Sequence, residues 1–233
     1  MGSVERRERE RQETRGAILD AARSILGERG YDGLTMRAVA DRIEYTPAAL
    51  YKHFTDREQL VRELCVNDFF GFNKIVRERG GSTKLDSKAP HGVLRALGHA
   101  YAEFAMRFPE QYRVMFMTPL PVDQTELASG DPEQDAYITT LRAVEDAQRL
   151  SAFPGLDAAL VAQTLWASIH GVVSIEIAHL CVKNGKIPFA SLAARITTAI
   201  DGILLGLEAL AAAQQSSRAA RRKRIPPHRR SSP

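Results

Sequence analysis

Apolar residues recur at helical spacing along nearly the whole chain, and runs of β-branched residues are short. The spacing predicts helices over residues 14–30, 36–43, 47–54, 55–76, 91–108, 109–116, 131–150, 157–182 and 189–214. Residues 118–132, with three prolines, predict a loop. We therefore expect an all-α fold in which an N-terminal three-helix domain precedes a C-terminal helical bundle.

The two short helices near the N-terminus carry clear start signals. Thr35 is a plausible N-cap for the helix at 36–43, and Thr46 is a plausible N-cap for the next one. Pro47 then stands at the first helical position, where its missing N–H costs nothing. About three residues around Glu44 and Tyr45 join the helices, which is the connection length of a helix-turn-helix. On spacing alone, DNA binding and plain packing explain this pair equally well.

The pattern divides the chain into four segments. Residues 1–13 alternate in charge and predict a flexible arm, which can also extend the first helix. Residues 14–56 form the predicted helix-turn-helix domain, and a capping box at Thr55–Glu58 opens the helix that follows it. Residues 57–214 are expected to form this linker helix and a helical domain for effector binding and dimerisation. Residues 215–233 predict a basic disordered tail.

The helices predicted at 157–182 and 189–214 are apolar around much of their circumference. A helix that is apolar on more than one face needs a second packing partner. A chain of this length offers little protein to cover both sides. We therefore expect these two helices to form a dimerisation face that pairs with its copy in a homodimer.

The net charge of +4 is unevenly distributed along the chain. Residues 216–233 contain seven Lys or Arg and no acid, so residues 1–215 carry a net charge of −3. The predicted globular part therefore cannot attract DNA through its overall field. Binding would depend on locally placed Arg and Lys side chains and on oriented backbone amides.

Composition narrows the class of protein. With 44% apolar residues the chain can build a core, which excludes disorder throughout. Polar residues interrupt every long apolar stretch, and the N-terminal residues lack an apolar signal core, so we expect a cytoplasmic protein with no membrane partner. Cys65 and Cys181 are too few for a disulfide framework and lack metal-ligand spacing. We expect no metal, no cofactor and no catalytic residues. The alternative hypothesis is an enzyme that uses His170 or the acids at 131–135, but the sequence shows no set of catalytic residues that supports it.

Near the N-terminus, a helix, a short turn and a second helix are followed by a capped linker helix. This order resembles the TetR family of bacterial transcriptional regulators. The resemblance covers residues 14–64 and includes the stretches 30–37 and 39–43. Its most specific part is Leu-Tyr-Lys-His-Phe at 50–54. The resemblance favours DNA binding over plain packing, and it implies a dimeric, all-helical regulator whose third helix enters the major groove.

The predicted DNA-binding residues lie on the two short helices and just beyond them. They are Thr35, Arg37, Thr46, Pro47, Ala48, Ala49, Tyr51, Lys52, His53 and Arg57. Small residues on the third helix would let the backbone approach base edges, with Ala methyls against thymine methyls. The family motif implies phosphate contacts for Tyr51 and His53, with Thr35 and Arg37 adding others, and Arg57 stands where the family commonly has Lys. Tyr45 can pack or read a base, and His53 can instead be only a capping residue.

A second resemblance concerns the C-terminal half. Trp166-x-x-x-His170-Gly171 and the segment 109–116 resemble the effector domain of a TetR branch named for its Trp-His-Gly signature. The resemblance implies a small-molecule effector that alters the spacing of the two DNA-binding domains of the dimer. The candidate ligand-binding residues are Tyr101, Phe104, Met115, Phe116, Trp166 and His170. Core packing is the alternative role for each of them.

Taken together, the sequence predicts a repressor that binds a palindromic DNA operator as a homodimer and is released by a small apolar effector. The alternative is a nonspecific nucleic-acid-binding protein driven by the basic tail. In that case removal of residues 216–233 would abolish binding, whereas it would leave operator binding mostly intact.

Overall fold

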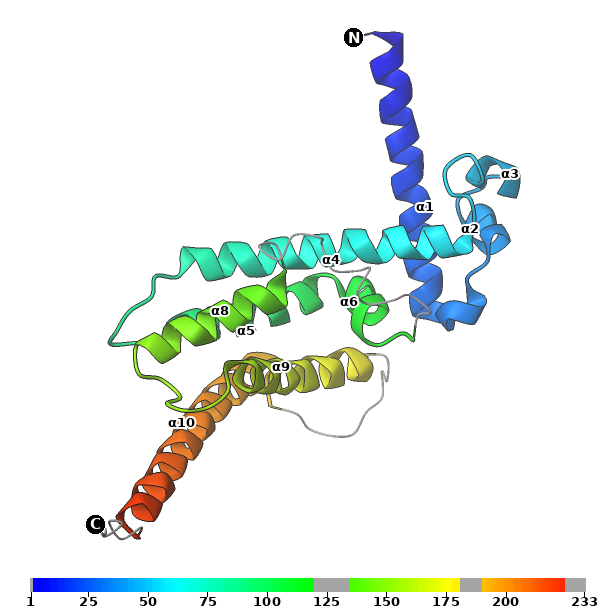
Figure 1. The fold of residues 1–233 in the computed structure, drawn as a ribbon. Helices are drawn as coiled ribbons and strands as arrows, with labels where there is room; N and C mark the ends of the chain where they lie inside the picture. Colours follow the sequence, from blue (N-terminus) through cyan, green and yellow to red (C-terminus); the bar gives the residue numbers. More distant parts are fainter. Residues whose placement is uncertain (1, 120–134, 181–189, 225–233) are drawn as a thin grey trace, which may run out of the picture. The chain divides into compact units, whose positions relative to one another are not determined.

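The computed structural model describes residues 2–119, 135–180 and 190–224 of the 233-residue chain. These residues form helices joined by turns and contain no strand, which confirms the all-α prediction (Figure 1). In chain order the helices are α1 (Ser3–Gly33), α2 (Met36–Arg42), α3 (Pro47–Leu50), α4 (Arg57–Ser82), α5 (Gly92–Arg107), α6 (Pro109–Phe116), α8 (Ala136–Arg149), α9 (Ala158–Leu180) and α10 (Leu192–Arg224). The predicted helix start at 131–132 lies outside the described residues.

The chain divides into two compact units, one of residues 1–75 and 103–136 and the other of residues 76–102 and 137–233. This division differs from the predicted boundary after residue 56. Leu60 and Leu64 of α4 and Val114 of α6 are fully buried in the same core as Ile18 and Leu50. The first turns of α4, together with α6, therefore complete the core of the N-terminal helices.

Local signals in the sequence explain how the first unit begins and ends its helices. Gly30 has φ +68°, a left-handed conformation that glycine adopts without steric cost, and it interrupts α1 where a helix stop is predicted. The Thr35 hydroxyl accepts a hydrogen bond from the Ala38 backbone N–H at 3.0 Å and caps α2 as predicted. The cap of α4 differs by one residue from the predicted box, because the Asp56 carboxylate accepts from the Gln59 N–H at 2.7 Å.

Residues 3–13, predicted as a flexible arm, are helical and continuous with α1. The Glu5 carboxylate accepts a hydrogen bond from the Gly2 N–H at 3.1 Å, which closes the first turn. Side chains one turn apart also interact, as the Gln12 amide does when it donates to Glu8 at 2.8 Å. Such pairs stabilise a helix modestly, and the buried half of α1 supplies the nucleus from which the helix extends.

In the second unit α9 packs against α10, and Gly98 of α5 allows a close approach to α10. A Cβ at Gly98 would lie 2.9 Å from the Ile200 Cδ1 atom. The connection between α8 and α9 is held on α10 by Glu208. Its carboxylate accepts from the Phe153 N–H at 3.2 Å and lies 2.8 Å from the His91 Nε2 atom. Asp157 caps α9, since its carboxylate accepts from the Leu160 N–H at 2.8 Å.

The helix α10 extends through Arg224, so residues 215–224 of the predicted disordered tail are helical. Residues 225–233 lie outside the described part of the chain. The stretch 209–224 contains no acid and several alanines, which have the highest helix propensity, and it follows a helix already fixed by packing. The basic residues at 218 and 221–224 therefore belong to a segment with a helical backbone.

The helices α9 and α10 carry exposed apolar side chains. These are Leu160, Trp166, Ile175, Leu205 and Leu210. By length and composition alone, the stretches Ala158–Ala178 and Leu192–Arg218 could each cross a membrane, which is weak evidence because core helices of soluble proteins meet the same criteria. The feature that needs an explanation is the exposed apolar surface itself.

Candidate nucleic-acid interface and effector site

The turn between α2 and α3 is tight and well defined. Glu44 has φ +59°, and the Tyr45 N–H donates to the Ala40 carbonyl at 2.9 Å, so the chain reverses within the predicted three residues. The Thr46 hydroxyl then accepts from the Ala49 N–H at 3.3 Å, which confirms Thr46 as the cap of α3. Together with Pro47 at the first helical position, these bonds fix the direction in which α3 leaves the turn.

The α-helical part of α3 ends at Leu50, four residues before the predicted end at Phe54. The chain continues as a tighter turn, in which the Lys52 N–H donates to Ala49 and the His53 N–H donates to Leu50, at 3.3 and 2.8 Å. This tightening is common in the last turn of a helix. Leu50 and Phe54 are almost completely buried and anchor both ends of the segment in the core.

The exposed residues of α2, of α3 and of the turns beside them form what we call the recognition surface. Its exposed residues are Thr35, Arg37, Tyr45, Thr46, Pro47, Ala48, Tyr51 and Lys52. Ala49 is half-buried beneath them. Tyr45 and Tyr51 are 48% and 54% exposed, which is high for aromatic side chains whose neighbours in the motif are buried in the core. Most of the predicted DNA-binding residues are thus exposed on the first unit, and Tyr45 does not pack in the core.

Arg37 reaches from α2 into solvent. Its side chain is 85% exposed, and its Nε atom lies 4.0 Å from the Asp41 carboxylate. An exposed pair at this distance contributes little to stability. The guanidinium is therefore available for another anion.

His53 lies at the edge of the recognition surface and is half-buried. Its Nδ1 atom is buried and has no hydrogen-bond partner in the described structure. Burial lowers the pKa of this imidazole below its usual 6.5, and the nearby charges of Arg11, Arg15 and Lys52 lower it further. The ring is therefore neutral at pH 7.

Arg15 holds His53 in place and was not among the predicted site residues. Its guanidinium donates to the His53 carbonyl at 2.6 Å, pairs with Glu63 of α4, and lies 4.3 Å above the Phe54 ring. One signal in the sequence could have found it, because Arg15 lies about one turn before the buried Ile18 and so borders the core face of α1.

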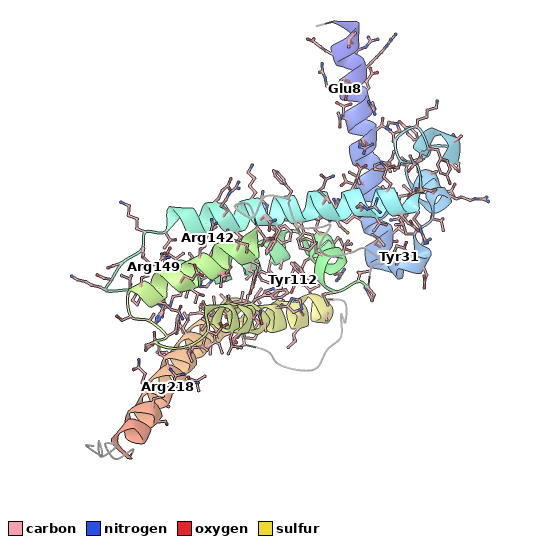
Figure 2. All side chains as sticks on the ribbon, viewed as in Figure 1. Glu8, Tyr31, Tyr112, Arg142, Arg149 and Arg218 are labelled. Atoms are coloured by element: carbon pink, nitrogen blue, oxygen red, sulfur yellow. The ribbon has the colours of Figure 1, made fainter. Side chains whose placement is uncertain are left out.

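Arg57 differs from the other predicted residues because the structure already engages it. Its guanidinium lies 4.3 Å above the ring of Tyr31, the residue labelled in Figure 2, and donates to the Leu34 carbonyl at 3.3 Å. It thereby ties the start of α4 to the end of α1. A phosphate contact from Arg57 would have to share or replace these interactions.

The six predicted effector residues fall into two groups in different units. In the first unit Phe104 and Phe116 belong to an aromatic cluster with α4, and Met115 precedes Phe116 in α6. The Phe72 ring lies 5.1 Å from Phe104 and 5.7 Å from Phe116, both in edge-to-face geometry. Phe104 is buried, and Met115 and Phe116 are half-buried.

In the second unit the Tyr101 hydroxyl lies 2.9 Å from the His170 Nδ1 atom, and the Trp166 ring lies 6.2 Å from the His170 ring. Burial lowers the pKa of His170 below its usual value, so the ring is neutral and offers one donor and one acceptor. Trp166 is 46% exposed on α9. The alternative role of core packing therefore fails for Trp166 within one chain.

Within residues 2–119, 135–180 and 190–224, no group of three or more His, Cys, Asp or Glu side chains could hold a metal ion. Cys65 is buried, and burial raises the pKa of its thiol to about 12, so the thiolate form is suppressed. Cys181 and the acids at 131–134 lie outside the described residues.

Two family models match the chain. One, described as "Bacterial regulatory proteins, tetR family", matches residues 18–64, and the other, "Tetracyclin repressor-like, C-terminal domain", matches residues 94–200. The chain belongs to the TetR family. The N-terminal match spans the recognition surface and the core beneath it, and the C-terminal match spans both groups of predicted effector residues. The finer assignment to the Trp-His-Gly branch stays a prediction.

Individual relatives of this TetR-family chain are distant. It is 26% identical over 104 residues to the uncharacterized HTH-type transcriptional regulator YobS of Bacillus subtilis, covering 45% of this chain and about half (52%) of the relative. It is 26% identical over 167 residues to an uncharacterized HTH-type transcriptional regulator of Mycobacterium tuberculosis, covering 70% of each chain. A solved structure of a protein of unknown function from Rhodococcus sp. RHA1 is 25% identical and matches with a TM-score of 0.64, covering 83% of this chain and 95% of the other.

Proposed function

We propose that this TetR-family protein is a transcriptional repressor that binds a palindromic DNA operator as a homodimer and is released by a small apolar effector. The observation that carries the proposal is the recognition surface. Its small and polar side chains face solvent, while Leu50 and Phe54 fix its backbone in the core. A recognition surface with a backbone anchored in this way suits the major groove, which admits an α-helix.

The residues of the recognition surface suit different parts of the DNA duplex. Thr46, Pro47, Ala48 and Ala49 are small, so the α3 backbone can approach base edges closely. Tyr51, together with Lys52, His53, Thr35 and Arg37, reaches farther and suits phosphate oxygens, which position the helix without reading sequence. Specificity would thus come from the start of α3 and affinity from its surroundings.

The exposed apolar side chains of α9 and α10 support a homodimer. Leu205 is 66% exposed and Leu160 is 54% exposed, on helices where Val173 and Leu204 are fully buried. Contiguous exposed apolar surface on a soluble protein marks an interaction site. A second copy buries this surface on both chains at once and gives the two-fold symmetry that a palindromic operator matches.

Release by an effector follows from linkage. An effector that prefers a dimer geometry unfit for DNA lowers operator affinity by the same coupling free energy by which DNA lowers effector affinity. Aromatic and Met side chains around Phe104 and Phe116 are suited to an adaptable apolar site. Within the second unit, the neutral His170 and its Tyr101 partner are polar groups that could contact an effector bound there. A cytoplasmic location remains a prediction.

The test is selection of bound sequences from a random duplex pool by the purified full chain, at several salt concentrations. The proposal predicts enrichment of one two-fold symmetric site. Enrichment should disappear for Tyr51→Ala/His53→Ala and persist for Lys84→Ala, an exposed lysine of the second unit. Absence of any enriched site, with binding that only weakens as salt rises, would overturn the proposal.

The second candidate function is nonspecific nucleic-acid binding by the C-terminal basic residues. It is favoured by the seven Lys or Arg after residue 215, which no acid offsets. It predicts equal affinity for all duplex sequences and loss of binding when residues 216–233 are removed. The operator proposal predicts that this truncation leaves the preference for the selected site intact.

A further inference from the structure

The first half of α1 carries basic side chains on the face that forms the core in its second half. Ile18 and Ile25 are buried against the rest of the first unit. At 100° per residue, Arg11 and Arg7 lie two and three turns before Ile18, on nearly the same side of the helix. Where α1 runs past the end of the core, arginines therefore replace isoleucines on the face that points toward the helix-turn-helix.

The acids of this segment lie elsewhere around the helix. Glu5, Glu10 and Glu13 fall on the flanks and on the far side, and Arg6 is placed to pair with Glu10, at 3.5 Å. Glu8 lies beside the basic face, and its carboxylate is 3.8 Å from the Arg11 guanidinium, a distance at which an exposed pair is weak. Residues 3–13 are thus neutral in sum but basic on one side.

This basic side is continuous with the recognition surface. Arg11 and Arg15 lie close enough to His53 for their charges to lower its pKa, and the Arg15 guanidinium donates to the His53 carbonyl. Lys52 adds a third cation at the same edge. The first turns of α1 continue beyond α3 in the first unit (Figure 1).

We propose that Arg7 and Arg11 form a second phosphate-binding surface, the arginine row, which contacts the DNA backbone flanking the half-site read by α3. This inference rests on the proposed DNA-binding function. The row adds affinity and extends the contacted length of duplex without reading sequence. Arg15 stays in its place as a positioning residue, because Glu63 and the His53 carbonyl already engage it.

The dimensions suit this role. From Arg7 to Arg11 the helix rises about 6 Å at 1.5 Å per residue. Each strand of duplex DNA carries one phosphate per about 3.4 Å of the duplex axis, so this rise corresponds to about two phosphate spacings on one strand. Neither Arg7 nor Arg11 supports the core, since both are exposed. Both are thus free to follow a phosphate backbone.

The test compares Arg7→Ala/Arg11→Ala with Arg6→Ala/Arg9→Ala, which removes the same number of charges from the same helix but outside the row, since Arg9 lies on the opposite side and Arg6 on the flank. Alanine keeps the helix, because it has the highest helix propensity. Fluorescence anisotropy measures affinity for the selected site at several salt concentrations. We expect the first variant to bind about tenfold more weakly near 0.15 M salt. Because the homodimer loses four arginines, the slope of log K against log salt should fall in magnitude by about four.

Two further arms sharpen the result. Wild-type protein should bind a duplex with flanking base pairs more tightly than one trimmed to the symmetric site, and Arg7→Ala/Arg11→Ala should lose that difference. Arg7→Lys/Arg11→Lys, which keeps the charges, should restore it. If both alanine variants weaken binding equally, or if neither does, the arginine row is wrong while operator binding stands. If wild-type protein selects no site at all, it is the proposed function that fails.

Discussion

The Asp68 carboxylate of α4 is buried and receives two hydrogen bonds from the Arg23 guanidinium of α1, at 2.7 and 3.1 Å. Arg23 also pairs with Asp20, whose side chain is 76% exposed. The pair ties α4 to α1 within the first unit. A buried charge that keeps both donors is tolerated, whereas the same charge without its partner is costly.

We therefore expect Asp68→Ala to lower the free energy of unfolding by about 3 kcal/mol, because it leaves the Arg23 guanidinium largely buried with only one acid. Asp20→Ala removes the exposed acid from the same arginine and should cost less than about 1 kcal/mol. Urea unfolding at fixed protein concentration measures both. Equal costs for the two variants would show that burial of Asp68 does not matter.

The affinity for the operator should depend on pH because of His53. Its pKa in the free protein is lowered from 6.5, whereas a DNA phosphate beside the ring would raise it, so the complex binds more protons than the free protein. Operator affinity should then rise as pH falls from about 7 through the lowered pKa. His53→Asn, which cannot titrate, should flatten the profile. A profile that is unchanged in His53→Asn would remove His53 from the phosphate contacts.

The dimer should depend on the exposed apolar side chains of α10. Leu205→Glu places a charge on this surface and should shift the protein from dimer to monomer in sedimentation equilibrium. Leu85→Glu makes the same change at an exposed leucine between α4 and α5, and should leave the dimer intact. A dimeric Leu205→Glu protein would place the interface elsewhere.

The single tryptophan gives an independent readout of the same interface. Trp166 is half-exposed on α9 in one chain, so its emission should shift to shorter wavelength as the dimer forms. The shift should follow protein concentration in wild type and be absent in Leu205→Glu. Emission that does not change with concentration would place Trp166 outside the interface.

Local signals predicted the helix-turn-helix well because its geometry is set by short-range chemistry. The caps at Thr35 and Thr46, the glycine at Gly30 and the turn at Glu44 all act within four residues of themselves.

Features that depend on distant residues could not be predicted in the same way. Residues 3–13 and 215–224 are helical because they extend helices that are stabilised elsewhere, and neither segment has an apolar stripe of its own. Helical spacing put Trp166 and His170 on one face, but it could not show that Phe104 and Phe116 pack against α4 in the other unit.

The most direct test of operator recognition is a titration of two labelled duplexes of equal length, one with the selected symmetric site and one with the same bases scrambled. The account predicts that wild-type protein binds the symmetric duplex at least 1,000-fold more tightly, roughly the lower end of specific recognition, and that Tyr51→Ala/His53→Ala loses this preference. Equal affinity for the two duplexes, lost when residues 216–233 are removed, would contradict it.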